Sequence, residues 1–171
     1  EKEVLELVEQ LGIARVRDLT ARNLHPEHLR RLVKKGHLER ISRGVYAPAG
    51  RQVTQHHSLV QVAVRAPASV VCLLSALQFH DLTTQMPRSV WIAIGPDHRS
   101  PRIRTPSVKV FRFSGRALAE GWQAHELEGL PVRVFGPAKT VADCFKFRNT
   151  VGIEVAIEAL RDCIRARRAT V

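Results

Sequence analysis

Apolar positions recur every three or four residues in the first part of the chain, which is the spacing of one buried face of an α-helix. Val4, Leu7 and Val8 form such a stripe, and Gly12 follows where the helix can end. A second, shorter helix is predicted over residues 16–21. The pattern therefore predicts two amphipathic helices at the start of the sequence.

The next stretch of the chain has the pattern of a short basic helix. Leu29, Leu32 and Val33 are spaced at i, i+3 and i+4 and form one apolar face. Pro26 suits the first turn, where its missing N–H needs no partner, and Gly36 can take the left-handed conformation that closes a helix. This pattern predicts a third helix between Pro26 and Gly36.

A basic β-hairpin is predicted directly after that helix. Residues 37–41 can extend as a strand, residues 42–44 supply a turn with a glycine, and residues 45–47 return before Pro48 stops the pairing. Six cations project from the helix and the hairpin. They are Arg30, Arg31, Lys34, Lys35, Arg40 and Arg43.

Three helices followed by a hairpin are the elements of a winged helix-turn-helix, whose third helix enters the major groove of DNA. A simpler interpretation is that the six cations form only a solvated helix face. We favour DNA contact, because the helix, its closing glycine, the hairpin and the charge all agree. We therefore expect a winged helix-turn-helix DNA-binding domain over residues 1–50.

The pattern changes after a short polar connection over residues 50–53. Short apolar strands and amphipathic helices now alternate. The expected strands are residues 70–72, 89–95, 107–113, 122–127 and 131–135, and the expected helices are residues 54–66, 75–80, 137–148 and 153–167. We therefore expect an α+β protein, in which the winged helix-turn-helix is followed by a mixed α/β C-terminal domain over residues 51–171.

The charge of the chain supports a polyanionic partner. The 171 residues are 44% hydrophobic and 25% charged, which is ordinary for a globular protein, but the formal net charge is +11. Such a charge favours nucleic acid over a membrane surface. No apolar run approaches the roughly 20 residues of a membrane span, and no signal-peptide pattern opens the sequence. We therefore expect a cytoplasmic protein.

The cysteines and histidines do not predict a metal site or a cofactor. The three cysteines are widely spaced in apolar stretches and are expected to be reduced core residues. They are Cys72, Cys144 and Cys163. His56 and His57 are adjacent, so on a helix their side chains diverge and make a poor metal clamp.

One segment of the C-terminal half resembles the end of a phosphate-binding loop. Residues 136–140 read Gly-Pro-Ala-Lys-Thr, but Ala138 stands where such a loop needs a glycine before the lysine. A plain helix start is the default interpretation, and its free N–H groups could bind an anion weakly. Lys139 and Thr140 would stand beside such an anion.

Catalysis is not expected. Asp143 is placed to pair with Lys139 or Lys146. A metal-dependent nuclease would need a second carboxylate, for which Glu154 or Glu158 is available on the last helix. The two clearest strands offer no carboxylate of their own, so the nuclease stays an open but less favoured alternative.

Four blocks of the sequence resemble the AbiEi family of antitoxins from bacterial type IV, abortive-infection toxin-antitoxin systems. The blocks are L-x-R-L-V-x-K-G-x-L-x-R-I-x-R-G-V-Y-A-P (29–48), S-A-L-Q-F-H-D-L-T (75–83), V-W-I-A-I (90–94) and P-A-K-T-V-A-D-C-F-K-F-R (137–148). The first block is shared with many winged-helix regulators, whereas the later blocks in this order are more specific. Some members extend further after the last helix than this sequence does.

The resemblance implies a two-domain repressor and antitoxin without catalytic activity. Its N-terminal domain would bind double-stranded DNA at inverted repeats in its own promoter, as a possible dimer. Its C-terminal domain would oppose a nucleotidyltransferase-like toxin, with or without direct contact. The antitoxin or anion-binding candidates that the resemblance implies in this domain are Lys139, Thr140, Asp143 and Arg148. The alternative is a winged-helix transcription factor whose C-terminal domain binds a ligand or dimerises, with no toxin partner.

Overall fold

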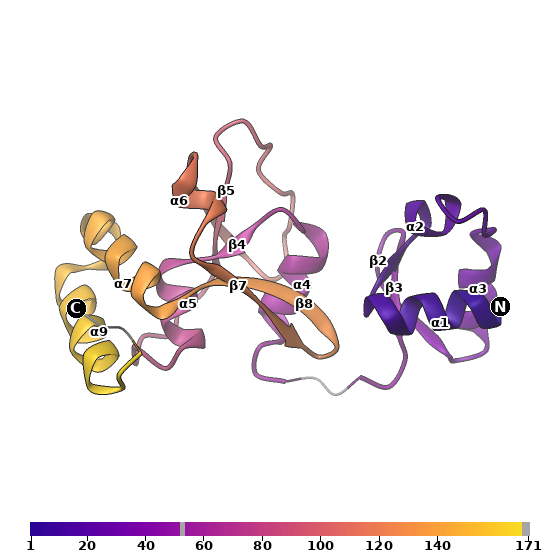
Figure 1. Cartoon of the computed structure of the whole chain (residues 1–171), viewed down its shortest axis with the longest axis horizontal. Coiled ribbons are helices and arrows are strands. Elements are labelled where there is room, and N and C mark those ends of the chain that lie inside the picture. The colour runs from indigo at the N-terminus through magenta and orange to yellow at the C-terminus, as the bar shows by residue number, and fades with distance from the viewer. Residues whose placement is uncertain (52–53, 169–171) are drawn as a thin grey trace.

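The structure is a computed structural model that describes residues 1–51 and 54–168 (Figure 1). The predicted connection over residues 50–53 therefore lies partly outside the described residues. An N-terminal module of three helices and a small sheet precedes a larger C-terminal part built on a five-stranded sheet. The predicted α+β fold class is confirmed.

The three predicted N-terminal helices are present, and their apolar stripes meet in one core. They are α1 (Lys2–Leu11), α2 (Val16–Thr20) and α3 (Glu27–Lys34). Val4, Leu19 and Leu29 come from one helix each, and all three are completely buried. Gly36 follows α3 with a φ of 77°, a left-handed conformation that glycine takes without strain.

The predicted hairpin is also present, and a third strand joins it. The strands are β1 (Ala14–Arg15), β2 (Leu38–Ser42) and β3 (Val45–Pro48). They pair antiparallel in the order β1-β3-β2. The sequence pattern does not predict β1, because two residues are too few to show an alternation.

The middle strand, β3, of this three-stranded sheet, which we call the wing sheet, is buried on both faces. Neighbouring residues of a strand point to opposite faces. In β3, Tyr46 joins the core of the N-terminal helices, whereas Val45 and Ala47 join a second core that includes residues of the C-terminal part. Ile13, just before β1, belongs to this second core as well. The wing sheet therefore connects the N-terminal helices to the rest of the molecule.

The C-terminal sheet contains the five strands that the sequence predicts. They are β4 (Val70–Val71), β5 (Val90–Ile94), β6 (Val108–Arg112), β7 (Trp122–Leu127) and β8 (Leu130–Phe135). Their order in the sheet is β6-β5-β4-β8-β7. The β5–β6 and β4–β8 pairs are parallel, and the β4–β5 and β7–β8 pairs are antiparallel.

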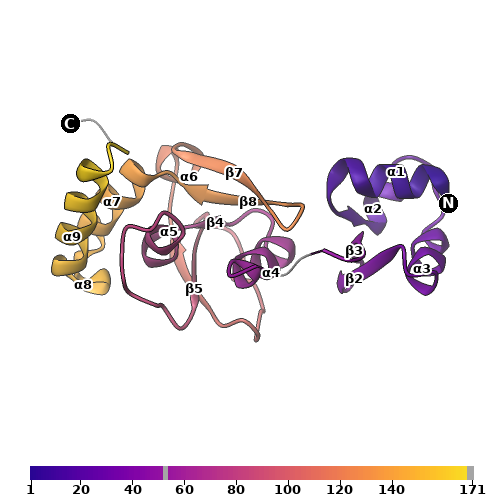
Figure 2. The same ribbon diagram turned by 90° about the horizontal axis from the view of Figure 1, so that it is seen from below.

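Helices cover both faces of this sheet (Figure 2). They are α4 (His57–Arg65), α5 (Leu73–Phe79), α6 (Arg116–Ala119), α7 (Pro137–Lys146), α8 (Arg148–Val151) and α9 (Ile153–Arg165). Trp91 and Ala93 of β5 pack in the core with α5, α7 and α9, while Ile92 packs in the core with α4. None of these helices, within the described ranges, is long and apolar enough to cross a membrane.

Several helix ends differ from the sequence prediction. α4 begins at His57 instead of Thr54, and the N–H of Thr54 donates to the Glu128 carboxylate. α5 begins earlier than expected, at Leu73. The helix predicted over residues 137–148 ends at Lys146, with α8 after it, and the last helix stops at Arg165 instead of residue 167. The sequence does not predict α6, which has only four residues.

Candidate DNA-binding surface

α3 has one buried face and one charged face. Leu29 and Leu32 are buried against the N-terminal core. Side chains are about 100° apart around a helix, so the cations spread over the opposite side. Arg30, Arg31, Lys34 and Lys35 are all exposed. The helix is therefore anchored by its leucines while its charges remain accessible.

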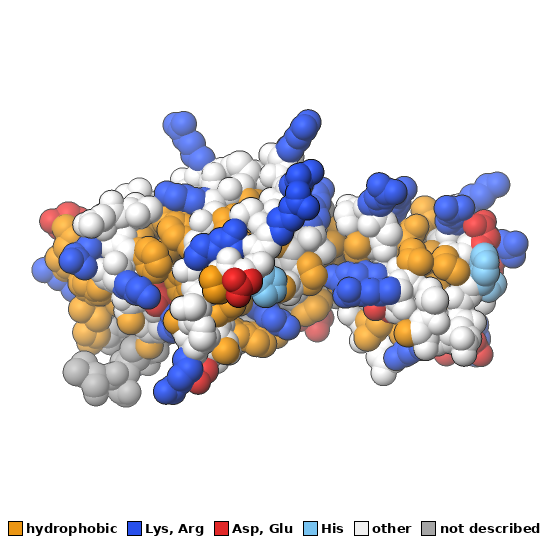
Figure 3. All heavy atoms as spheres, turned by 90° about the horizontal axis from the view of Figure 1, so that it is seen from above, with side chains coloured by type: hydrophobic (Ala, Val, Ile, Leu, Met, Phe, Trp, Pro, Cys, Tyr) orange, Lys and Arg blue, Asp and Glu red, His pale blue; other side chains and the backbone are white. Residues whose placement is uncertain are grey.

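The two predicted cations of the hairpin are exposed as well. Arg40 lies on β2, and Arg43 lies in the turn between β2 and β3. The Arg40 Nε donates to the Ser42 carbonyl oxygen at 3.3 Å, which holds this side chain near the turn. Lys and Arg side chains project from the surface of the N-terminal module (Figure 3). All six predicted cations therefore escape burial under the C-terminal part.

Little negative charge opposes these cations. The Lys35 Nζ lies 2.5 Å from a Glu1 carboxylate oxygen, and the Arg30 Nη1 lies 3.4 Å from a Glu27 oxygen. Both pairs are exposed, and water screens the attraction within an exposed pair, so a phosphate can replace the carboxylate. The other four cations make no ion pair with the described residues. They are Arg31, Lys34, Arg40 and Arg43.

The candidate anion-binding residues of the C-terminal part are mostly engaged inside the protein. Thr140 is completely buried, and its hydroxyl donates to the Phe135 carbonyl oxygen at 3.1 Å. The Lys139 Nζ lies 2.5 Å from an Asp143 carboxylate oxygen and 4.6 Å from the centre of the Phe135 ring. Arg148 is exposed and donates to a backbone carbonyl. The hydroxyl proton of Thr140 is therefore not available to an anion.

Asp143 forms one of the two ion pairs that the sequence allows, the one with Lys139. Burial holds the pKa of its carboxyl above the ordinary value even though Lys139 donates to it. Among residues 1–51 and 54–168, no three His, Cys, Asp or Glu side chains are grouped as a metal site requires. The contact that the structure shows for Asp143 is thus the pair with Lys139, one turn earlier on α7.

The three cysteines are buried free thiols, as the sequence predicts. Burial and the charge of Asp143 raise the pKa of the Cys144 thiol to about 12. Burial also raises the pKa of Cys72 well above its ordinary value. Because the thiolate is the reactive form, these side chains are unreactive at neutral pH.

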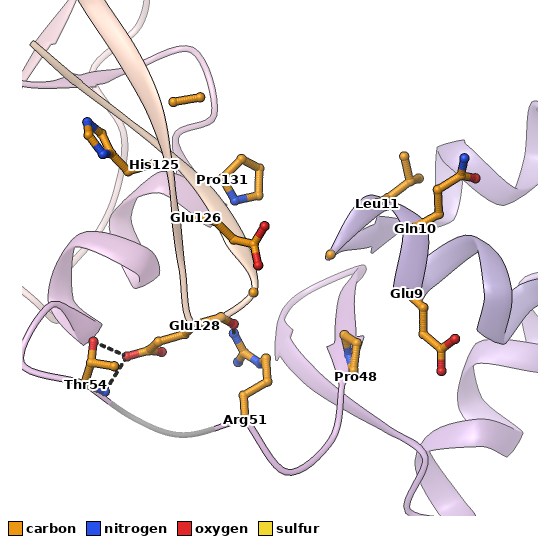
Figure 4. Close-up of a pocket in the computed structure, with 13 residues that line it drawn as sticks. Glu9, Gln10, Leu11, Pro48, Arg51, Thr54, His125, Glu126, Glu128 and Pro131 are labelled. Carbon is orange, nitrogen blue, oxygen red and sulfur yellow. Dashed lines mark hydrogen bonds between the residues drawn. The ribbon is translucent and has the colours of Figure 1, made fainter.

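A hollow of about 820 Å³ lies between α1 and the β7–β8 hairpin (Figure 4). Residues of α1 face it from one side and residues of the hairpin from the other. Among the lining residues are Glu9, Gln10, Leu11, His125, Glu126 and Pro131. The sequence gives no indication of this hollow, because its two walls come from distant segments of the chain.

Glu128, in the turn of the β7–β8 hairpin, holds the segment that leaves the N-terminal module. Its carboxylate accepts the backbone N–H of Thr54 at 2.7 Å and lies 2.8 Å from the His57 Nδ1. Burial opposes ionisation of this carboxyl, but the hydrogen bonds from Thr54 and His57 outweigh it, so its pKa lies below the ordinary value. Arg51 donates to the Glu128 carbonyl oxygen and pairs with Glu39 of β2 at 2.7 Å. These contacts fix the connection to both parts.

The N-terminal module also matches a known protein family. Residues 2–49 match the family model described as "Transcriptional regulator, AbiEi antitoxin". Over these residues the N-terminal module is similar to AbiEi antitoxins. The matched segment includes α3, the hairpin and all six cations, whereas the candidate residues from Lys139 to Arg148 lie outside it.

The fold of the chain as a whole is similar to that of a solved structure. The crystal structure of the RV2827C protein from Mycobacterium tuberculosis superposes with a TM-score of 0.50 at 16% sequence identity. The alignment covers 82% of this chain and 58% of that chain, so this chain spans little more than half of that protein's length. At this identity the likeness shows the fold alone. A comparison with the curated proteins finds no match.

Proposed function

We propose that this protein is a DNA-binding repressor and antitoxin of a type IV toxin-antitoxin system. The protein is cytoplasmic. It binds inverted repeats upstream of its own operon, and it counteracts a nucleotidyltransferase-like toxin. The observation that carries the proposal is the set of exposed cations on α3 and the hairpin of an AbiEi module. The proposal does not require a stable complex with the toxin.

DNA binding by this surface follows from simple electrostatics. α3 enters the major groove with its charged face, and Arg43 of the hairpin turn contacts the phosphate backbone. Each neutralised phosphate releases counterions, so log affinity falls with log salt by about 0.9 per phosphate. With about five phosphates per subunit the slope is roughly −4 to −5, and it doubles for two subunits on an inverted repeat.

The first prediction concerns the helix that reads DNA. Replacing Arg31 or Lys34 by alanine weakens binding to the upstream DNA by about 1–3 kcal/mol for each side chain that reaches a base. Folding is unaffected, because both side chains point away from the buried leucines of α3. Gel-shift titrations at several salt concentrations measure the affinity, and circular dichroism checks the fold.

Arg161→Ala is the matched control for these variants. Arg161 is an exposed arginine on α9, at the end of the molecule away from α3 (Figure 1). The Arg161→Ala variant loses the same net charge as the α3 variants. Its affinity for DNA therefore reports the long-range electrostatic effect alone. If Arg31→Ala and Lys34→Ala bind as tightly as Arg161→Ala, α3 is not the reading helix.

The antitoxin role is tested separately, in cells. The neighbouring gene is expressed with the full chain, with Arg31→Ala and without the chain, and growth is scored. We expect the toxin gene to encode a nucleotidyltransferase-like protein and the full chain to restore growth. Operator binding without any restoration of growth would support the alternative, a winged-helix transcription factor with a ligand-binding or dimerising C-terminal part and no toxin partner.

A further inference from the structure

The last helix, α9, carries its large apolar side chains on the outside. Its face toward the C-terminal core consists of small residues that are at most 1% exposed, namely Ala156, Ala159 and Cys163. Another side of the helix carries a row of four large apolar residues, which we call the outer stripe. They are Ile153, Ile157, Leu160 and Ile164.

The outer stripe is accessible to a partner. Ile153 is 42% exposed, Leu160 38% and Ile164 47%, and Ile157 is partly buried. Among the residues that the structure describes, only six large hydrophobic side chains are exposed, and these three are half of them. None of the four residues joins a hydrophobic core of the described residues. Single exposed apolar side chains are ordinary, but a continuous row of them marks an interface.

The spacing of the outer stripe fits a second copy of the same helix. Its residues follow one another in steps of four, three and four, which is the spacing of the seam between two packed helices. These steps are the same when read in either direction. In an antiparallel pair, Ile153 therefore meets Ile164 of the second copy, and Ile157 meets Leu160. A surface that matches itself in this way forms a twofold dimer.

Charges beside the outer stripe select the antiparallel direction. Glu154 follows Ile153, and Arg165 follows Ile164. Where these isoleucines face each other across two copies, a carboxylate therefore lies beside a guanidinium at each end of the pair. Parallel helices would instead bring like charges together, and their dipoles would repel. Glu154 makes no ion pair with the described residues, and the 3.4 Å pair of Arg165 with Asp162 is exposed and easily exchanged.

We propose that α9 packs antiparallel against α9 of a second copy through the outer stripe, so that the protein forms a dimer in solution. α9 lies at the end of the molecule away from α3 (Figure 1). The dimer therefore leaves both DNA-binding surfaces open. Its formation does not require DNA, and its use on an inverted repeat rests on the proposed function.

Sedimentation velocity of the full chain, without DNA and over a range of protein concentrations, tests the dimer. A stripe of four side chains is a small interface, so we expect a reversible dimer with a dissociation constant of about 1–100 µM. Leu160→Ala should raise this constant at least about tenfold, because each dimer loses two leucine side chains. Ile164→Ala should act in the same direction. Circular dichroism should show an unchanged fold, because neither side chain is buried in the single chain.

Met86→Ala is the matched control for these two variants. Met86 is an apolar residue that is 79% exposed, in the loop between α5 and β5. Its replacement should change the dissociation constant of the dimer by less than about twofold. Arg161→Ala, the control of the DNA titrations, keeps the outer stripe complete and should also dimerise as the unchanged protein does.

Disulfide trapping tests the direction of the two helices. Ile153→Cys and Ile164→Cys chains are mixed in equal amounts and oxidised, and the linked peptides are identified by mass spectrometry. The three native thiols are buried and do not compete. An antiparallel pair gives the mixed disulfide between the two variants. Disulfides only between chains of the same variant would overturn the antiparallel arrangement.

The outcomes separate the dimer from the proposed function. If the unchanged protein stays monomeric throughout the concentration series, or if Leu160→Ala and Met86→Ala dimerise equally well, the inference fails. DNA binding by α3 would still stand, because the gel-shift titrations measure it independently. If the protein dimerises through α9 but shows no salt-sensitive binding to the upstream DNA, the proposed function fails and the dimer stands.

Discussion

Two histidines of the C-terminal part illustrate how single residues respond to burial. His80 is buried, and its Nε2 donates to the Phe135 carbonyl oxygen at 2.8 Å. The ring of His125 lies 6.2 Å from that of His80, centre to centre. Burial is the main cause that lowers the pKa of both rings, and for His80 the charge of Arg168 acts in the same direction. Both rings are therefore neutral in the folded protein at neutral pH.

This burial makes the stability of the protein depend on pH. In the unfolded chain both rings take up a proton near their ordinary pKa of 6.5, whereas the folded state resists protonation. The stabilisation is complete above pH 6.5 and is lost as the pH falls through the lowered pKa values. We expect urea unfolding at pH 5.5 to show a smaller free energy of unfolding than at pH 7.5.

His125→Gln should reduce this pH dependence, and His37→Gln, at an exposed position of the N-terminal module, should leave it unchanged. Glu128 does not contribute in this window. Its pKa lies below the ordinary value of 4.5, so its stabilisation is lost only at more acid pH. Equal free energies of unfolding at the two pH values would contradict the assignment to the histidines.

At the scale of the element, α5 and β5 are joined by one buried hydrogen bond. The Ser75 hydroxyl of α5 accepts the backbone N–H of Trp91 at 2.9 Å. Ser75→Ala leaves that N–H buried without a partner, which costs about 1–3 kcal/mol. We expect denaturant unfolding, followed by tryptophan fluorescence, to show a loss of this size.

Ser58→Ala is the matched control for this hydrogen bond, because Ser58 is an exposed serine on α4. Its effect should stay within about 0.5 kcal/mol. Equal losses in the two variants would mean that the Ser75 hydroxyl gives β5 no net support.

Hydrophobic periodicity predicts most of these elements, and the misses have physical causes. β1 and α6 are too short to show a repeat. Thr54, the expected start of α4, donates its N–H to Glu128, 74 residues further along the chain. Long-range contacts of this kind leave no local pattern.

Part of the candidate site could likewise be predicted from the sequence, and part of it could not. The charged face of α3 follows from the spacing of Leu29 and Leu32, because the buried side of a helix fixes its exposed side. Arg15, Arg65 and Arg102 come together only through the tertiary fold. No sequence spacing relates these three arginines, so their proximity could not be predicted.

At the scale of the whole molecule, the two parts meet closely at Gly12 and Gly129. A Cβ atom added at Gly12 would lie 2.2 Å from the Gly129 carbonyl oxygen, and Gly12 has a φ of 69°. We expect Gly12→Ala to separate the module from the β7–β8 hairpin and to destabilise the protein by at least about 1 kcal/mol. Gly50→Ala is the matched control, since Gly50 has a φ of 79° but no atom within 4 Å of an added Cβ.

Natural probes report on the two parts separately. Tyr46 is the only tyrosine and lies in the module, while both tryptophans, Trp91 and Trp122, lie in the C-terminal part. In the unchanged protein, the NMR signal of fluorotyrosine-labelled Tyr46 and the tryptophan fluorescence should follow one unfolding transition. In Gly12→Ala the tyrosine signal should change at lower denaturant than the fluorescence. Coincident transitions in that variant would show that the close approach does not couple the two parts.

The burial of β3 on both of its faces limits how this module can be reused. Grafting the first fifty or so residues onto an unrelated effector would uncover Ile13, Val45 and Ala47 on one side. The chimera would then expose an apolar surface patch, which promotes aggregation. Recombination can therefore move this module into a new protein only together with other residues that cover β3.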